Sequence, residues 1–329
     1  YSGTNSGGDL YIVSSIFRNN MGGIAPNTLD SELLPPERES FIIGNHIENN
    51  NNTKAPAWPN QYITLGNGII IAGGNNNLIK NNVISENNGL GYSGTNSGGD
   101  LYIVSSIFRN NMGGIAPNTL DSELLPPERE SFIIGNHIEN NNNTKAPAWP
   151  NQYITLGNGI IIAGGNNNVI KNNVINDHNL FGVVVTASFD DNYWPAHGNL
   201  VQDNIIINSN KADMALSGVS NLANCFKGNT FQTSFPPGIQ TSGSCGSNLF
   251  ARGSDLSGLW SSIARVVYVN KGSFEVGDWR TMPEPPLQAN MPSPSSYFSN
   301  VFPAVDVFAN YDIDFTNIKL PETAEKYLN

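Results

Sequence analysis

The chain has 329 residues, of which 13% are charged, a low share for a compact α/β enzyme. Its 16 Lys and Arg residues are scattered among 27 Asp and Glu residues, which gives a net charge of -11. This composition excludes a basic surface for nucleic acid, and no apolar run approaches the roughly 18 to 20 residues that span a bilayer. We therefore expect neither a nucleic-acid partner nor a membrane span.

A long internal repeat dominates the first half of the chain. Residues 1–91 recur as residues 92–182, and we call these the first and second blocks. The two blocks differ at six positions, namely Leu78/Val169, Ser85/Asn176, Glu86/Asp177, Asn87/His178, Gly89/Leu180 and Leu90/Phe181. Three origins fit so close a match: a recent duplication, a deliberate insertion, or a chain assembled from overlapping fragments.

Within each block a shorter pattern recurs, apolar-apolar-x-x-Asn-x-apolar, for example at residues 132–138 and 200–206. Branched apolar runs such as 69–71, bounded by Gly or Asn, predict strands. Aligning the pattern places one residue of each coil in a single column, which we call the Asn column. Its members are Asn45, Asn82, Asn136, Asn173, Asn204 and Asn229, with Ser15 and Ser106 at the same place in two coils. One Asn per coil at a bend predicts a hydrogen-bonded ladder through about eight stacked coils; the alternative is that Asn is simply a common turn residue.

Three kinds of segment interrupt the coils. Residues 21–40 and their copy 112–131 are acidic and rich in Pro, residues 49–68 and 140–159 are rich in Asn, and residues 186–198 carry aromatic and acidic side chains. Long loops in a repeat protein commonly project from one side, which is often its binding face. We expect such an arrangement here.

The coil pattern fades after residue 245. Cys225 and Cys245 are the only cysteines, and their spacing predicts a disulfide, which requires an oxidising compartment; two buried free thiols are the alternative. Residues 246–329 are rich in Pro and Ser, so we expect a tail, partly extended, that covers the last coil or runs back along the solenoid. A separate C-terminal domain is the alternative, although so few residues make a small core.

The repeats at residues 44–49, 77–84 and 198–206 resemble those of right-handed parallel β-helix proteins of the pectate-lyase-like superfamily, including NosD-type members. The resemblance implies an all-β, single-stranded, right-handed parallel β-helix over residues 1–245, and an exported protein that often handles polysaccharide. It transfers no catalytic residue, because none of the superfamily's active-site motifs matches this sequence.

Two groups of charged residues are catalytic candidates. Glu128, Arg129 and Glu130 supply the base and the cation that β-elimination of a polysaccharide needs, but they also suit a solvated turn. Asp190 and Asp191 supply the paired carboxylates of a glycoside hydrolase, but they also suit a polar loop tip. No Cys and His spacing predicts a metal site, so we expect no cofactor, with Ca²⁺ relevant only to a lyase.

Aromatic residues in the loops are the candidates for sugar contact, because flat rings on exposed loops stack on pyranose faces. These residues are Trp58, Trp149, Tyr193 and Trp194. The alternative is that the same rings fold inward and fill the loops.

These observations predict an extracellular, cell-surface or periplasmic β-helix that acts as a scaffold or binds a polysaccharide or cell-surface glycan. Whether it is an enzyme stays open; a lyase, an epimerase or a glycoside hydrolase is the first alternative. The second alternative is a structural subunit that self-associates end to end through the N-terminal coil, since Tyr1 begins within a coil that has no visible cap.

Overall fold

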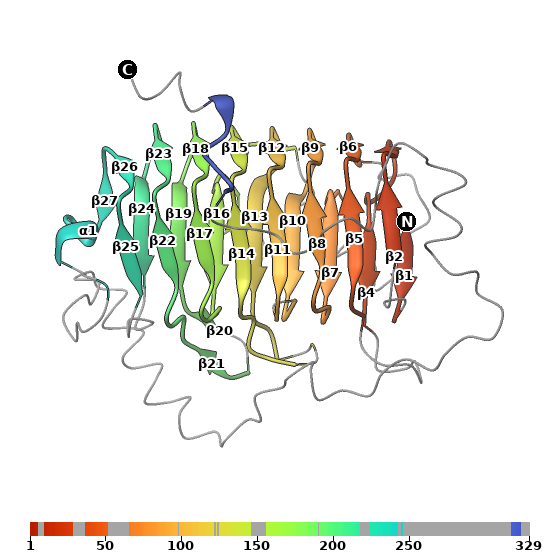
Figure 1. Ribbon diagram of the computed structural model, residues 1–329, viewed down its shortest axis with the longest axis horizontal. Coiled ribbons are helices and arrows are strands. Elements are labelled where there is room, and N and C mark those ends of the chain that lie inside the picture. Colours follow the sequence, from red (N-terminus) through yellow and green to blue (C-terminus); the bar gives the residue numbers. More distant parts are fainter. Residues whose placement is uncertain are drawn as a thin grey trace.

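The computed structural model describes residues 1–5, 10–28, 37–51, 66–97, 99–121, 123, 125–145, 156–189, 191–217, 224–242, 245 and 317–323. These residues form a parallel β-helix, in which each coil contributes one strand to each of three parallel sheets (Figure 1). Sheets B and C have eight strands each and sheet A has nine, so the described part of the chain makes the eight coils that the sequence predicts.

Sheet A contains β1 (Ser2–Thr4), β4 (Ala25–Asn27), β7 (Ile69–Ala72), β10 (Leu90–Thr95), β13 (Gly113–Asn118), β16 (Ile160–Ala163), β19 (Phe181–Thr186), β24 (Ala212–Ser217) and β27 (Ser234–Phe235). Sheet B contains β2 (Leu10–Val13), β5 (Ser40–Ile43), β8 (Leu78–Lys80), β11 (Leu101–Val104), β14 (Ser131–Ile134), β17 (Val169–Lys171), β22 (Leu200–Gln202) and β25 (Cys225–Lys227).

Sheet C contains β3 (Ile16–Arg18), β6 (His46–Glu48), β9 (Val83–Ser85), β12 (Ile107–Arg109), β15 (His137–Glu139), β18 (Val174–Asn176), β23 (Ile205–Ile207) and β26 (Thr230–Phe231). Two further strands, β20 (Ser188–Phe189) and β21 (Tyr193–Trp194), form an antiparallel hairpin, and the helix α1 (Ile239–Ser242) follows the last coil.

Columns of apolar side chains fill the interior. In sheet C the inner position of each strand is Ile or Phe, and the register aligns Ile84 with Ile47 and Phe108, all of them fully buried. A strand of three or four residues buries little surface alone, so each coil depends on the coils stacked against it. The core therefore runs along the whole axis of the solenoid.

The turn from sheet B to sheet C has two residues in every coil. The first has positive φ, as at Asn81 (φ 55°) and Asp203 (φ 54°), and the second belongs to the Asn column. The main-chain N–H of each column residue donates to the side-chain oxygen of the next coil, as in Ser15 to Asn45 (2.9 Å), Asn45 to Asn82 (2.9 Å), Asn82 to Ser106 (3.1 Å), Ser106 to Asn136 (2.9 Å), Asn136 to Asn173 (2.8 Å), Asn173 to Asn204 (2.9 Å) and Asn204 to Asn229 (3.0 Å). These bonds form one continuous ladder.

The long connections begin and end at two corners of the coils, and most of the residues that would show on which side they project lie outside the described part of the chain. Residues 28–39, 119–130 and 187–199 link sheet A to sheet B, while residues 49–68 and 140–159 link sheet C to sheet A. Insertions are absent from the described turns between sheets B and C, because the ladder fixes the length of those turns. Among the described coils, the variation in length therefore falls at these two corners.

The C-terminal end of the solenoid is closed by α1 and a disulfide. Gln240 Oε1 in α1 accepts hydrogen bonds from the main-chain N–H and the Nδ2 of Asn229, at 2.8 and 2.9 Å, and so continues the ladder beyond the last coil. Cys225 in β25 is bonded to Cys245, which confirms the predicted disulfide.

Further along the chain, residues 317–323 lie against the turns after β14 and β17 (Figure 1, blue). The rest of the predicted tail, residues 246–316 and 324–329, lies outside the described part of the chain.

Candidate functional site

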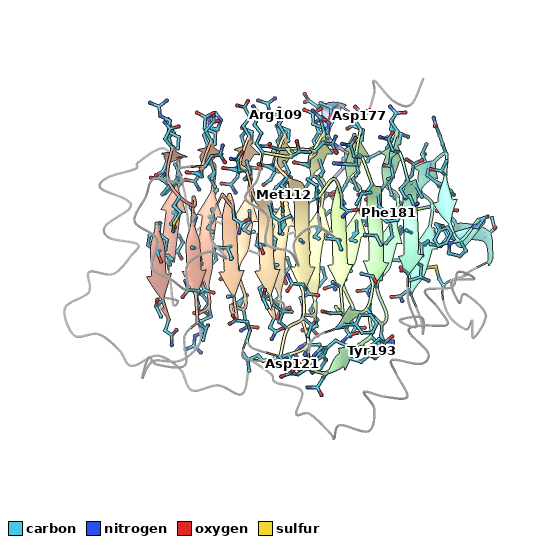
Figure 2. The ribbon with its side chains drawn as sticks, turned by 180° about the vertical axis from the view of Figure 1, so that it is seen from behind. Arg109, Met112, Asp121, Asp177, Phe181 and Tyr193 are labelled. Atoms are coloured by element: carbon cyan, nitrogen blue, oxygen red, sulfur yellow. A yellow bond between two sulfur atoms is a disulfide. The ribbon has the colours of Figure 1, made fainter. Side chains whose placement is uncertain are left out.

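Two loops that lie far apart in the sequence meet at the corner between sheets A and B. Asp121, in the loop after β13, accepts hydrogen bonds from the hairpin that follows β19: from the main-chain N–H and Nδ2 of Asn192, both at 2.7 Å, and from the indole Nε1 of Trp194 at 3.0 Å. Figure 2 shows Asp121 and Tyr193 together at this edge of the solenoid. A buried or half-buried carboxylate with several N–H donors is a strong anchor, so Asp121 fixes the hairpin.

The same corner aligns an Arg and a His. Isolated parallel bridges pair Arg129 with Asn166 and Asn166 with His197, and the main-chain N–H of His197 donates to Asn166 Oδ1 at 2.9 Å. The three residues thus occupy equivalent places in consecutive coils, and about 10 Å separates the first from the third at the usual spacing of strands. We call Asp121, Arg129, Glu130, Phe189, Asp191, Tyr193 and His197 the corner surface.

The aromatic rings of the hairpin are not all exposed, although sugar contact would require exposed rings. Tyr193 is 5% exposed and Trp194 is 2% exposed, so both fold inward, as in the alternative prediction. The exposed ring is Phe189 in β20, at 49%, and its centroid lies 5.0 Å from that of Tyr193 at a tilt of 57°. Position within a two-residue strand decides which ring faces out, and the sequence did not reveal that strand. Trp58 and Trp149 lie outside the described residues.

Glu128 is fully buried inside the solenoid, which corrects its expected place in an exposed loop. Its carboxyl group accepts hydrogen bonds from Ser131 Oγ and from Asn168 Nδ2, the latter at 2.9 Å, and Gly165 in the next coil leaves the space that this carboxyl needs. Burial raises the pKa of Glu128 to about 7. A group enclosed in this way has a structural role and no access to a polymeric substrate.

The first block repeats this arrangement at Glu37. Ser40 Oγ and Asn77 Nδ2 donate to its carboxyl group, and burial raises its pKa to about 7 as well. Between the two carboxyl groups lies Tyr92, whose hydroxyl group is 2.8 Å from Ser97 Oγ and whose pKa is raised by burial and by both Glu residues. The spacing Glu-x-x-Ser, present at the same place in both blocks, is the sequence signal for this buried network.

The remaining charges of the corner are mainly acidic. Arg129 Nε lies 4.0 Å from Glu130 Oε2, and the side chain of Arg129 is only 13% exposed. Asp191 is exposed on the hairpin turn, and its neighbour Asp190 is outside the described residues. Within the described ranges, no group of three or more His, Cys, Asp or Glu residues is arranged to hold a metal ion.

The fold and this corner define a parallel β-helix with a surface built by two loops. No protein-family model matches the chain, so its resemblance to NosD-type repeats and to the pectate-lyase-like superfamily remains a prediction, and no curated protein matches it either. Among solved structures it is similar to the periplasmic alginate epimerase AlgG, with a TM-score of 0.49 and 14% identity. That match covers 68% of this chain and 47% of AlgG, about half of its length.

Proposed function

We propose that this chain is an exported protein that binds a neutral polysaccharide at the corner surface. The observation that carries the proposal is the convergence of the two loops, in which Asp121 holds a hairpin that presents the 49% exposed ring of Phe189 beside the exposed Asp191. An aromatic face next to hydrogen-bond acceptors suits a pyranose, which has one apolar face and a rim of hydroxyl groups.

The charge of the corner favours a neutral ligand over a polyanion. Among the residues of the corner surface, Asp121, Glu130 and Asp191 oppose the single guanidinium of Arg129, and the whole chain carries -11. Carboxylates that face a polyuronate repel it, and the repulsion is greatest at low ionic strength. A neutral glycan avoids this cost.

One further observation supports export. The disulfide between Cys225 and Cys245 joins the last coil to the chain beyond α1, and such bonds form and persist in oxidising compartments. No helix in the described ranges is long and apolar enough to cross a membrane.

Binding to neutral and acidic polysaccharides, measured by affinity electrophoresis and on a glycan array, tests the proposal. Phe189→Ala should weaken binding of the neutral ligand about five- to thirty-fold, because a stacking contact contributes about 1–2 kcal/mol. The matched control is Phe235→Ala in β27, which removes another exposed ring (36%) and should leave affinity unchanged. Equal affinities of the two variants, or binding of acidic polymers alone, would contradict this assignment.

The alignment of Arg129 with His197 favours a second candidate, a lyase or epimerase acting on a polyuronate. Such an enzyme needs a base for the proton next to the carboxylate and a cation for the enolate, and His197 and Arg129 are the residue types that fill these roles. Ultraviolet absorbance detects the unsaturated product of a lyase, and uptake of solvent deuterium into the polymer detects an epimerase. If the wild-type chain gives either signal and His197→Ala loses it, the protein is an enzyme rather than a binding protein.

A further inference from the structure

The C-terminal segment 317–323 lies on the second block at the turns between sheets B and C. Ile318 fills the space over Gly135 and packs against the cluster that contains Ile134. Its carbonyl oxygen accepts a hydrogen bond from Asn172 Nδ2 at 2.6 Å, and Leu320 packs against Val174 and Ile205. Ile134, Gly135, Asn172 and Val174 are the part of this docking surface that belongs to the block.

The first block carries the same four residues, Ile43, Gly44, Asn81 and Val83, 91 positions earlier. Their backbone is also the same: φ is 66° at Gly44 and 68° at Gly135, and 55° at both Asn81 and Asn172. A Cβ placed on Gly135 meets Ile318 Cγ2 and, at 3.3 Å, Lys319 O. A Cβ placed on Gly44 meets, among described residues, only Ser14 Oγ at 3.8 Å.

Exposure differs between the blocks as this contact requires. Gly135 is buried whereas Gly44 is exposed, and Ile134 and Val174 are 1% and 0% exposed whereas Ile43 and Val83 are half-buried. Nearby, the side chain of His137 is 10% exposed and that of its counterpart His46 is 44% exposed. The described part of the chain therefore holds one docking segment and two docking surfaces, of which the first lies open.

We propose that the open surface of the first block binds an extended segment of a partner protein with the sequence chemistry aliphatic-x-aliphatic, as in Ile318-Lys319-Leu320. The alternation of burial along the segment sets this chemistry, because Ile318 and Leu320 are half-buried while Lys319 between them is exposed. A second copy of this chain can offer its own segment only by uncovering its second block, so a different chain is the better occupant.

One side of the docking surface differs between the blocks, and this difference predicts a further feature of the partner segment. Next to Val83 the following coil presents Ile107 and Arg109, where the coil next to Val174 presents Ile205 and Ile207. The apolar contact with the second aliphatic residue is kept at Ile107. The exposed Arg109 (Figure 2) favours an acidic residue in the partner segment, shortly after its second aliphatic residue. Glu322 follows Leu320 in the same way.

A labelled synthetic peptide of residues 317–323, titrated into the full chain and followed by fluorescence anisotropy, tests the proposal. We expect one saturable site with Kd on the order of 0.1 mM, because few contacts offset the lost freedom of a short peptide. Asn81→Gly keeps the positive φ and removes the amide, and it should weaken binding about five-fold. The control Asn172→Gly changes the equivalent amide under the chain's own segment and should leave the affinity of the open site unchanged.

Peptides with Ile318→Asp or Leu320→Asp should not bind. Absence of saturable binding to the wild-type chain would overturn the proposal. Equal weakening by Asn81→Gly and Asn172→Gly, or weakening by Asn172→Gly alone, would also overturn it, since the peptide would then be displacing the chain's own segment. A dimer in sedimentation that the peptide dissociates would assign the surface to a second copy instead.

Discussion

Glu37 and Glu128 show how single residues set the response of the fold to pH. Each is fully buried, each is hydrogen-bonded to a Ser and an Asn, and burial raises the pKa of each to about 7 from its ordinary value of 4.5. A carboxyl group whose pKa is raised on folding takes up protons as the chain folds. Its neutral form is therefore the one that the interior accommodates.

The free energy of unfolding should consequently fall as the pH rises from about 4.5 to about 7. The loss is up to about 3 kcal/mol for each carboxyl group, since one pKa unit corresponds to 1.36 kcal/mol. Glu128→Gln replaces the neutral acid by an amide of the same shape, so the variant should gain stability relative to wild type as the pH rises. Urea unfolding at pH 5 and pH 8 measures the difference.

The comparison with Glu128→Gln is needed because His178 acts in the opposite direction. Burial lowers the pKa of His178 to about 4, so this residue makes the fold more stable as the pH rises from about 4 to 6.5. His178 contributes equally to the stability of wild type and of Glu128→Gln, so its contribution cancels in the difference between them. Parallel stability curves of wild type and variant would show that the carboxyl group is not neutral in the fold.

At the scale of the element, the turn from sheet B to sheet C is the most constrained part of each coil. Asn136 illustrates this: its Oδ1 accepts from the main-chain N–H of Ser106 at 2.9 Å, and its Nδ2 donates to the carbonyl oxygen of Ile103 at 2.8 Å. One side chain thus satisfies main-chain groups of the preceding coil, which explains why the described turns keep one length.

Asn136→Ala should lower the free energy of unfolding by about 2–3 kcal/mol, because it leaves a buried N–H and a buried C=O without their partner. Asn136→Ser should cost less, since Ser106 occupies the same column and its Oγ accepts the N–H of Asn82 at 3.1 Å. Urea unfolding of the two variants checks this order. If both cost the same, the ladder amides would contribute only through packing.

For the whole molecule, the repeat predicts that the chain tolerates the loss of a block. Tyr92 and Val183 occupy equivalent places in β10 and β19 of sheet A, three coils apart, with the intervening β13 and β16 in register. A chain without residues 92–182 should therefore fold with every later coil in register. The deletion joins the first block directly to the coil that begins at Val183.

Small-angle X-ray scattering should show the deletion variant to be shorter along its axis by about 14 Å, three coils at about 4.8 Å each. Circular dichroism should keep the same β-rich spectrum, and thermal unfolding should stay cooperative. An unfolded or aggregated product would mean that contacts particular to the second block, such as those with residues 317–323, are required for folding.

The sequence by itself determined what repeats with each coil. The spacing of Ile84, Asn82 and their counterparts predicted the strands, the inner column and the ladder, because in a stacked solenoid each such position has the same neighbours in every coil. The disulfide was also predictable, since the chain has only two cysteines.

Only the tertiary structure decided the contacts that do not repeat. Asp121 reaches Trp194 across 73 residues, and Ile318 lies on the second block although the first offers the same residues. The hairpin after β19 and the C-terminal segment each occur once, so the order of the residues does not state which surface they meet. That choice depends on chain length and on the space that each coil leaves open, and both become defined only when the solenoid is stacked.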